Sequence, residues 1–353
     1  MATFFEQGPG YPVVESVRVD KVSPTARLVK NIRAILVVVA AIIGLIPIFV
    51  MGLTTFKSRA AVVAVPPKFI PWSSETATID RSASRDVFDP FFKPTLEGIV
   101  FLLTERSQFS AARQEEAEQN RDELGLFGQV ALDNGQRITG PSDFVMRLRN
   151  SLIIAGGSTV ASVALGVFAA YAFSRFNLPG KDDLLFFILS TRMLPGVVVA
   201  VPIFLMYRQL GLHDSHLGMI ILYTVFNLSL TVWLLKGFID EIPKEYEEAA
   251  LVDGYTRFQA FYKIVLPQAV TGIAATTVFA LIFAWNEYAF ALMLTSQNAR
   301  TAPPAIATMQ GRGGIEWSAI AAGSLVFLIP VVIITFALRK HLLRGVTFGA
   351  IRQ

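Results

Sequence analysis

Long apolar runs alternate with shorter polar segments along most of this chain. Each of six runs holds about 20 residues, and a helix of that length crosses a hydrocarbon core of roughly 30 Å. Backbone amides in lipid must find their partners within the segment, so we expect helices here. The runs are Ala34–Phe56, Asn150–Phe173, Leu184–Tyr207, Leu217–Leu235, Ala269–Leu294 and Ala319–Leu338. The pattern therefore predicts an all-α membrane protein with six transmembrane helices.

The polar segments divide the chain around these spans. A tail spotted with Gly and Pro, 1–33, precedes the first span, 34–56. The longest polar segment, 57–149, separates the first two spans and is expected to begin extended around its prolines. Composition predicts a helix over 114–118 and a small hairpin over 130–138. This segment is interpreted as a cap with no chemistry of its own, or as a docking surface for an external partner.

The remaining chain is a predicted five-helix core, 150–340, with a polar loop at 236–268 and a tail at 341–353. Basic residues collect on the side of the two termini, which the positive-inside rule makes cytoplasmic. The opposite short loops offer few basic residues, and a segment as long as 57–149 translocates regardless of charge. The basic residues on the terminal side are Arg18, Lys21, Arg27, Lys30, Arg33, Arg175, Lys181, Lys236, Lys244, Arg257, Lys263, Arg339, Lys340, Arg344 and Arg352.

Composition agrees with a chain surrounded by lipid. Of its 353 residues, 53% are hydrophobic and 16% are charged, whereas soluble domains carry about 25% charged residues. The absence of cysteine excludes disulfides and thiolate metal sites. The net charge of +4 is typical of basic cytoplasmic loops, so a nucleic-acid partner is not expected.

The loop at 236–268 is a charged insertion between two apolar runs. Its first part predicts a short helix, Lys244–Val252, with acidic residues near the positive end of the helix dipole. Gly254 can adopt the left-handed conformation that ends a helix. A second helix is expected over Thr256–Val265, stopped by Pro267. Such an elbow could simply connect two spans, or it could dock a soluble partner.

The spacing of the loop decides between these readings. It holds E-A-A, two residues, D-G, nine residues and then I-x-L-P. This pattern resembles the EAA loop of ABC-importer permeases. Further similar stretches are FKSRAAVVAVPPKF at 56–69, RNSLIIAGG at 149–157, AYAFSRF at 170–176, WNEYAFAL at 285–292 and HLLRGVTF at 341–348. The chain is thus similar to the inner-membrane permease subunit of a type I ABC importer of the carbohydrate-uptake family, related to the smaller permease of the maltose system.

The resemblance implies a fold, partners and roles. The fold would be that of a type I importer permease with an enlarged periplasmic loop, in a bacterial inner membrane. The implied partners are a homologous second permease subunit, two ATPase subunits and a periplasmic solute-binding protein, besides membrane lipid. Glu248 would contact the ATPase, and the loop Thr295–Ser318 would contact the binding protein. The implied ATPase-coupling residues are Glu247, Glu248, Ala249, Ala250, Asp253, Gly254, Leu266 and Pro267.

The chain shows no phosphate-binding loop of the G-x-x-x-x-G-K-[ST] type. Gly180-Lys181 is followed by Asp182 and lacks the upstream glycine. We therefore expect no cofactor in this chain, with ATP and Mg bound by the partner ATPase.

Polar residues within the apolar runs are the candidates for the solute pathway, because they are costly in lipid. They could bind a polyhydroxylated solute, or they could hydrogen-bond helix to helix. Arg192 could also form an ion pair with Glu287. The candidates are Asn227, Trp285, Asn286 and Glu287.

Other functions are less consistent with the sequence. A stand-alone secondary transporter would need more spans, inverted repeats and broken helices. A membrane enzyme would need a catalytic set, which we do not find. His213 and His216 lie close together but lack a third ligand, so no metal site is expected. We predict a permease subunit of an ATP-driven, binding-protein-dependent importer for a sugar, polyol or related polyhydroxylated solute.

Overall fold

The computed structural model describes residues 24–64, 68–71, 91–311 and 314–348. The chain divides into two compact units, Met1–Phe49 and Val50–Gln353. The expectations for residues 1–23 and for the extended prolines Pro66 and Pro67 lie outside the described residues. Helix α1 (Pro24–Thr55) begins ten residues before the predicted first span. Its large apolar side chains from Leu28 to Phe49 are exposed, and an apolar helix of this length can span a membrane.

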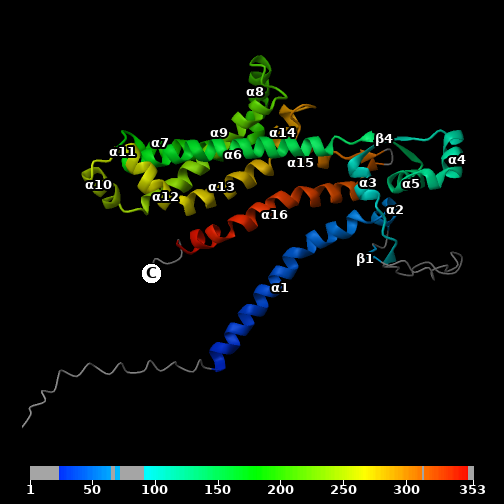
Figure 1. The fold of residues 1–353 in the computed structure, drawn as a ribbon, viewed down its shortest axis with the longest axis horizontal. Helices are drawn as coiled ribbons and strands as arrows, with labels where there is room; N and C mark the ends of the chain where they lie inside the picture. The colour runs from blue at the N-terminus through cyan, green and yellow to red at the C-terminus, as the bar shows by residue number, and fades with distance from the viewer. Residues whose placement is uncertain (1–23, 65–67, 72–90, 312–313, 349–353) are drawn as a thin grey trace, which may run out of the picture. The chain divides into compact units, whose positions relative to one another are not determined.

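Four long helices form the second unit's core: α6 (Phe144–Arg175), α9 (His216–Asp240), α13 (Val270–Trp285) and α16 (Trp317–Phe348). Figure 1 shows α6, α9 and α13 side by side. α6 meets α9 through small buried residues, among them Ala155, Ser158 and Ser162. Small residues let helices approach closely in lipid. The hydroxyl of Thr231 donates to the Ser162 carbonyl at 3.2 Å across this contact.

Because α6 and α9 pack closely, we expect a methyl group added at Gly166 to destabilise the protein. A Cβ at Gly166 would lie 2.7 Å from Oγ1 of Thr231, whereas one at Gly156 in the same helix meets nothing within 4 Å. Thr231 is fully buried and cannot move aside cheaply. We expect Gly166→Ala to cost about 1–3 kcal/mol of stability through overpacking. Thermal unfolding in detergent measures this, and an equal melting temperature for Gly166→Ala and Gly156→Ala would contradict it.

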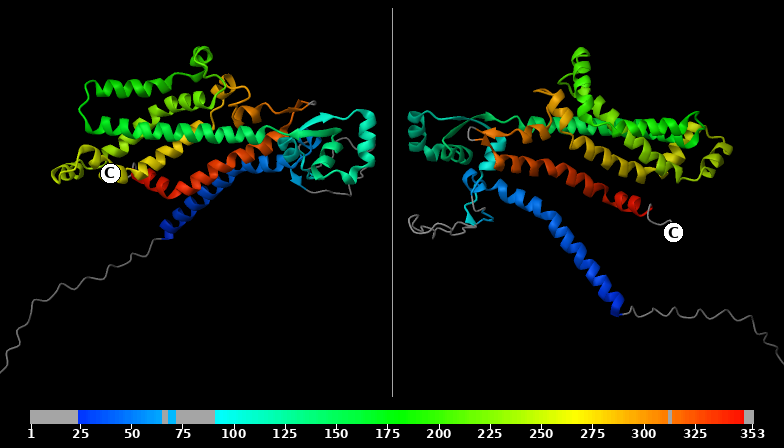
Figure 2. Two further views of the ribbon diagram at one scale, coloured as in Figure 1. Left: turned by 45° about the horizontal axis from the view of Figure 1, so that its top comes forward. Right: turned by 180° about the vertical axis from the view of Figure 1, so that it is seen from behind.

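Two further predicted spans are bent pairs of helices. α7 (Lys181–Ser190) and the turn η2 (Thr191–Met193) precede α8 (Gly196–Gln209), and the pair is bent by 92°. Figure 2 shows α8 turned away from α7. The expectation of one continuous helix over 184–207 is therefore wrong. Pro195 explains the break, because a residue before proline avoids helical geometry, and Leu194 is extended (φ −73°, ψ 122°).

The second bent pair follows the polar loop. α11 (Arg257–Ala260), the π-helical turn η3 (Phe261–Val265) and α12 (Leu266–Gln268) join α13 at a 72° bend. Pro267 does not stop the helix as expected, because the helical run of α11 and η3 continues through it to Gln268 and bends only after α12. The fifth span also ends early, at Trp285, and α14 (Ala289–Leu294) follows separately. Four single helices have the length and apolarity of a span, or up to six spans if each bent pair counts as one, within the described residues.

Residues 91–141 build a small module at one end of α6. The predicted helix at 114–118 is confirmed as α4 (Ala111–Gln119). The predicted hairpin at 130–138 is wrong. Helix α5 (Leu126–Asp133) buries Ala131 and Leu132, and β4 (Gln136–Pro141) pairs antiparallel with the distant β3 (Thr104–Gln108). The other short elements are α2 (Arg59–Val62), β1 (Ile70–Pro71), β2 (Phe91–Phe92), α3 (Glu97–Leu103), η1 (Arg121–Glu123), α10 (Glu245–Val252), α15 (Ala302–Ala307), β5 (Gln310–Gly311) and β6 (Gly314–Ile315).

The small module and the helices α10–α12 lie at opposite ends of α6 (Figures 1 and 2). β4 leads into the N-terminal end of α6, while α10–α12 lie beside its C-terminal end. α6 has 32 residues, so it separates the two by about 48 Å at 1.5 Å per residue. A helix of this length reaches across a whole bilayer with its headgroups.

Candidate functional site

The polar loop folds into a compact elbow of two helices, which we call the coupling elbow (residues 241–268). α10 ends at Val252, and Gly254 just after its C-cap has a left-handed φ of +87°, as the sequence predicts. The amide of Tyr255 then donates to the Ala250 carbonyl at 3.0 Å. α11 begins with a capping box, in which Thr256 and Gln259 exchange side-chain and backbone hydrogen bonds. The angle between α10 and α11 is therefore fixed by local chemistry.

The two adjacent glutamates of α10 point in opposite directions. Glu247 is 7% exposed, whereas Glu248 is exposed. The Glu247 carboxylate forms a buried ion pair with Arg175 and accepts a hydrogen bond from the Tyr171 hydroxyl at 2.9 Å. Glu247 thus holds α10 against the end of α6, and of the two adjacent glutamates Glu248 is the one whose side chain is accessible.

Arg175 is the centre of this attachment. Its guanidinium also donates to the Ile242 carbonyl at 2.8 Å and to the Ser174 hydroxyl at 2.9 Å. Ser174 donates to Asp240 at 2.5 Å, so the ends of α6, α9 and α10 share one polar network. Sequence reasoning missed this network. The stretch AYAFSRF holds three of its residues and was the signal that could have identified it.

The outer face of the coupling elbow is apolar for a charged loop. Val252 is 87% exposed, and the aromatic rings of Phe258 and Tyr262 are 67% and 62% exposed. Exposed apolar side chains that gather on a polar segment are typical of surfaces that contact a protein or a membrane. Of the other predicted coupling residues, Ala249, Asp253 and Pro267 are exposed, Leu266 is half-buried and Ala250 is buried.

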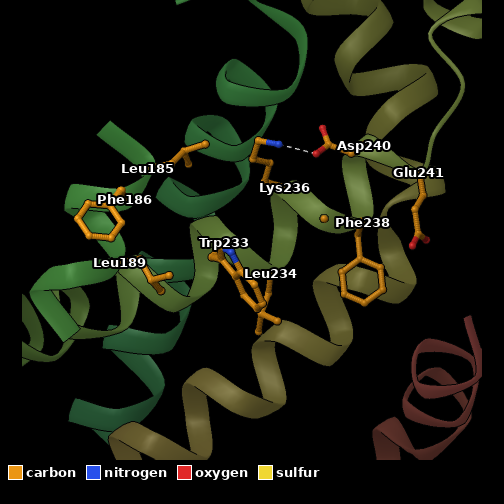
Figure 3. Close-up of a pocket in the computed structure, with 10 residues that line it drawn as sticks. Leu185, Phe186, Leu189, Trp233, Leu234, Lys236, Phe238, Asp240 and Glu241 are labelled. Atoms are coloured by element: carbon orange, nitrogen blue, oxygen red, sulfur yellow. Dashed lines mark hydrogen bonds and ion pairs between the residues drawn. The ribbon is translucent and has the colours of Figure 1, made fainter. Parts of the chain in front are cut away.

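A hollow of about 690 Å³ lies between α7 and α9. Figure 3 shows Leu189 of α7 beside Trp233 of α9, and Leu185 and Phe186 of α7 also line this hollow. Lys236 and Asp240 form an ion pair at 2.5 Å beside it. Its lining residues include none of the predicted site residues, but Asp240 connects it to the network around Arg175.

A second hollow, about 280 Å³, contains two of the predicted pathway residues, Asn227 and Glu287. Buried Asn227 donates its amide to the Ala280 carbonyl at 3.1 Å, which joins α9 to α13. Glu287 accepts the Tyr223 hydroxyl at 2.6 Å and the amides of Phe290 and Ala291. The proposed ion pair of Arg192 with Glu287 does not form.

The other two pathway candidates lie beside this cavity. Trp285 is buried, stacks on Phe327 with ring centroids 4.7 Å apart, and donates to the Phe327 carbonyl at 3.1 Å. Its indole therefore packs α13 against α16. Asn286 is exposed and donates to the Ile282 carbonyl at 2.9 Å. A pathway role for the four residues stays a prediction, with Asn286 and Glu287 the more accessible pair.

The loop after α14 is organised by a single carboxylate. Asp214 accepts hydrogen bonds from the amides of Ser296, Gln297, Asn298 and Ala299 at 2.9–3.1 Å, and from the Ser296 hydroxyl at 2.8 Å. The predicted docking loop is thus fixed where it begins. His216 contacts Asn150 at 2.9 Å, and the described residues contain no cluster of three metal-binding side chains.

Acid should leave this Asp214 loop intact. Burial alone would raise the pKa of Asp214, but the hydrogen bonds from Ser296, Ala299 and Asn298 outweigh it and hold the pKa well below its usual range. A depressed pKa contributes stability above the ordinary value near 4, and the contribution is lost only as pH falls through the lower one. We expect the amides of Ser296–Ala299 to stay protected from hydrogen exchange at pH 4–5.

Asp214→Asn tests the same carboxylate directly. It removes the charge and one acceptor, so exchange of these amides should accelerate by about tenfold or more, since hydrogen bonds to charged groups are the stronger ones. Asp122→Asn, on the exposed turn η1, is the control. Unchanged protection in Asp214→Asn would contradict this role.

Comparisons with known proteins agree with this architecture. The trehalose transport system permease protein SugB of Mycobacterium tuberculosis is 38% identical over 226 residues, 63% of this chain and 82% of that protein. The trehalose/maltose transport system permease protein MalG of Thermococcus litoralis is 33% identical over 211 residues, 59% of this chain and 76% of that protein. A crystal structure of a bacterial ABC transporter involved in the import of the acidic polysaccharide alginate shares the fold. It has a TM-score of 0.57 at 20% identity and covers 90% of this chain and 98% of that chain.

Residues 162–348, more than half of the chain, match the family described as "Binding-protein-dependent transport system inner membrane component". The match includes the coupling elbow, the two hollows and the Asp214 loop. Members of this family are membrane permease subunits and not enzymes, since ATP hydrolysis lies in a separate ATPase. The chain belongs to this family, the multi-pass permease subunits of binding-protein-dependent ABC importers.

Proposed function

We propose that this chain forms one half of the pathway through which an ATP-driven importer carries a sugar, polyol or related polyhydroxylated solute. The observation that carries the proposal is the coupling elbow, which the Arg175–Glu247 pair fastens to the core while Glu248, Phe258 and Tyr262 stay exposed. The solute class is supported by the relatives, which are named for trehalose and maltose transport.

We assign the proposed partners to the two opposite ends of the long helix α6. Two ATPase subunits, holding ATP and Mg, would dock at the coupling elbows of this chain and of a homologous second permease. A periplasmic solute-binding protein would dock at the opposite end, near the Asp214 loop and the 91–141 module. The chain would lie in a bacterial inner membrane with both termini cytoplasmic and 57–149 periplasmic.

Movement of α10 would reach the long helices α6 and α9 through the polar contacts around Arg175. When the ATPases close on ATP, they would carry the exposed face of α10 with them. Because Glu247 is paired with Arg175 in the core, movement of α10 pulls directly on α6 and, through Ser174 and Asp240, on α9. Rocking of these helices would open the pathway alternately to either side, and the solute would pass Asn286 and Glu287.

Purification of the full-length tagged chain from its native membrane tests the proposal. We expect an ATPase and a second permease to co-purify, and the complex with its binding protein to take up at least one labelled neutral or acidic sugar (trehalose, maltose or glucuronate) into liposomes only with ATP. A purified chain that moves solute alone would contradict the proposal and favour a stand-alone secondary transporter.

A further inference from the structure

The smaller hollow, which we call the Arg192 cavity, lies where α9, α13 and α14 meet the break between α7 and α8. Its volume is about 280 Å³. Three phenylalanine side chains, Phe226, Phe283 and Phe290, form its apolar walls. Such a hollow, mostly apolar with a few converging polar groups, is the usual form of a small-molecule site.

Arg192 is the charged group in this cavity with unused hydrogen-bonding capacity. Its Nη1 makes a long hydrogen bond, 3.4 Å, to the Phe226 carbonyl, and its guanidinium lies 4.2 Å from the centroid of the Phe283 ring. No ion pair to Arg192 forms among the described residues. A guanidinium carries five N–H donors, so most of them are left for a ligand. A cation in a membrane span is costly and is retained mainly for function.

Glu287, the carboxylate in the same cavity, is already engaged. Its oxygens accept the Tyr223 hydroxyl and the amides of Phe290 and Ala291 at 2.6–3.0 Å. These contacts tie the start of α14 to α9. Glu287 therefore stabilises the wall of the cavity, and Arg192 stands out as the site of recognition.

The break in the third span adds to the positive character around Arg192. α8 has 14 residues and begins at Gly196, which lines the cavity. The first amides of a helix have no partner within it, and its dipole is positive at that end. Broken helices of transporters present such ends to anionic groups of their substrates. A Cβ at Gly196 would lie 3.2 Å from the Phe290 ring, so glycine lets the start of α8 pack closely against α14.

We propose that the Arg192 cavity binds an anionic oxygen group, a carboxylate or sulfonate, of a sugar-derived solute. Arg192 is then a specificity-determining residue that favours acidic over neutral sugars, while the phenylalanine rings contact the apolar face of the sugar. Arginine suits this role because its planar fork matches two oxygens of one anionic group. The inference rests on the proposed function as an importer subunit.

The absence of cysteine allows a clean test in the assembled complex. Leu194→Cys places one thiol on the cavity wall, and Leu126→Cys on the exposed surface of α5 is the control. Each is labelled with an anionic reagent, sulfonatoethyl methanethiosulfonate, and a cationic one, trimethylammonium-ethyl methanethiosulfonate. The ratio of the two rates, normalised to the control, reports the potential in the cavity. Glucuronate and glucose are then compared as protecting ligands.

We expect the ratio at Leu194→Cys to favour the anionic reagent by about tenfold over the control. Arg192→Gln should abolish this preference and Arg192→Lys should keep most of it. Glucuronate should slow labelling more than glucose does. An absent preference, a preference that survives Arg192→Gln, or glucuronate protecting no better than glucose overturns the inference. Failure of the chain to assemble with an ATPase would contradict the proposed function instead, so the two failures are distinguishable.

Discussion

Gly254→Pro is expected to abolish ATP-driven uptake while the chain still inserts into the membrane. Gly254 has φ +87°, whereas proline fixes φ near −65°. The turn between α10 and α11 cannot form with proline there, so the exposed faces of the two helices lose their relative orientation. Uptake into proteoliposomes and co-purification of the ATPase measure the effect. The spans themselves contain no part of this turn.

Two milder substitutions distinguish the effect of this turn on uptake from the effect of backbone strain alone. Gly180, at the start of α7, also has a left-handed φ of +67° and open space around it. Alanine at either position costs about 1 kcal/mol of backbone strain. Gly254→Ala should reduce uptake and Gly180→Ala should not. Glu248→Lys should also abolish uptake, because it reverses the charge that would face the ATPase under the proposed function. Normal uptake by both Gly254→Pro and Glu248→Lys would contradict the assignment.

Glu247→Ala and Arg175→Ala are expected to detach the coupling elbow from the core. The side chains of Arg175 and Glu247 are 5% and 10% exposed. Removing one partner leaves a buried charge uncompensated, which costs about 3–5 kcal/mol. Both variants should therefore melt at a lower temperature in detergent and lose uptake.

The neighbouring glutamate is the control for this pair. Glu248→Ala removes an exposed side chain, so it should keep the melting temperature and lose only ATPase association. Arg175→Met combined with Glu247→Leu removes both charges together and should recover most of the lost stability. Equal melting temperatures for Glu247→Ala and Glu248→Ala would show that the buried pair does not hold the elbow.

The elbow was predictable because its chemistry is local. The acidic residues near the start of α10 favour a helix there, and Gly254 favours the turn that follows it. All of these signals lie within a few residues of one another. The orientation of Glu247 was not predictable, because adjacent residues on a short helix differ only in what packs against them. That partner, Arg175, lies 72 residues away in the sequence.

The errors in the spans have a common physical origin. Apolarity identifies which segments enter the membrane, but it does not report a bend within them. Pro195 and the polar pair Asn286-Glu287 both interrupt runs that hydropathy joins. The hairpin expected around Asn134-Gly135 failed for a different reason. The chain does turn at Asn134-Gly135, where Gly135 has a left-handed φ of +67°. However, the strand after the turn pairs with β3, about 30 residues upstream.

The candidate pathway was only partly predictable from polarity. Asn227 and Trp285 use their polar atoms between helices, so their side chains position α13. Arg192 was visible as an intramembrane cation. Only the packing of α13 and α14 shows that Glu287 is engaged elsewhere and that Arg192 lacks a carboxylate partner among the described residues.

The most direct test of the account is where the outer face of α10 lies and what covers it. Val252→Cys puts a single thiol at a position that is 87% exposed, in a chain without cysteine. Membrane-impermeant maleimide should label it from the cytoplasmic side of stripped vesicles, and added ATPase should block the labelling. Labelling only from the periplasmic side, or labelling that the ATPase leaves unchanged, would contradict the account.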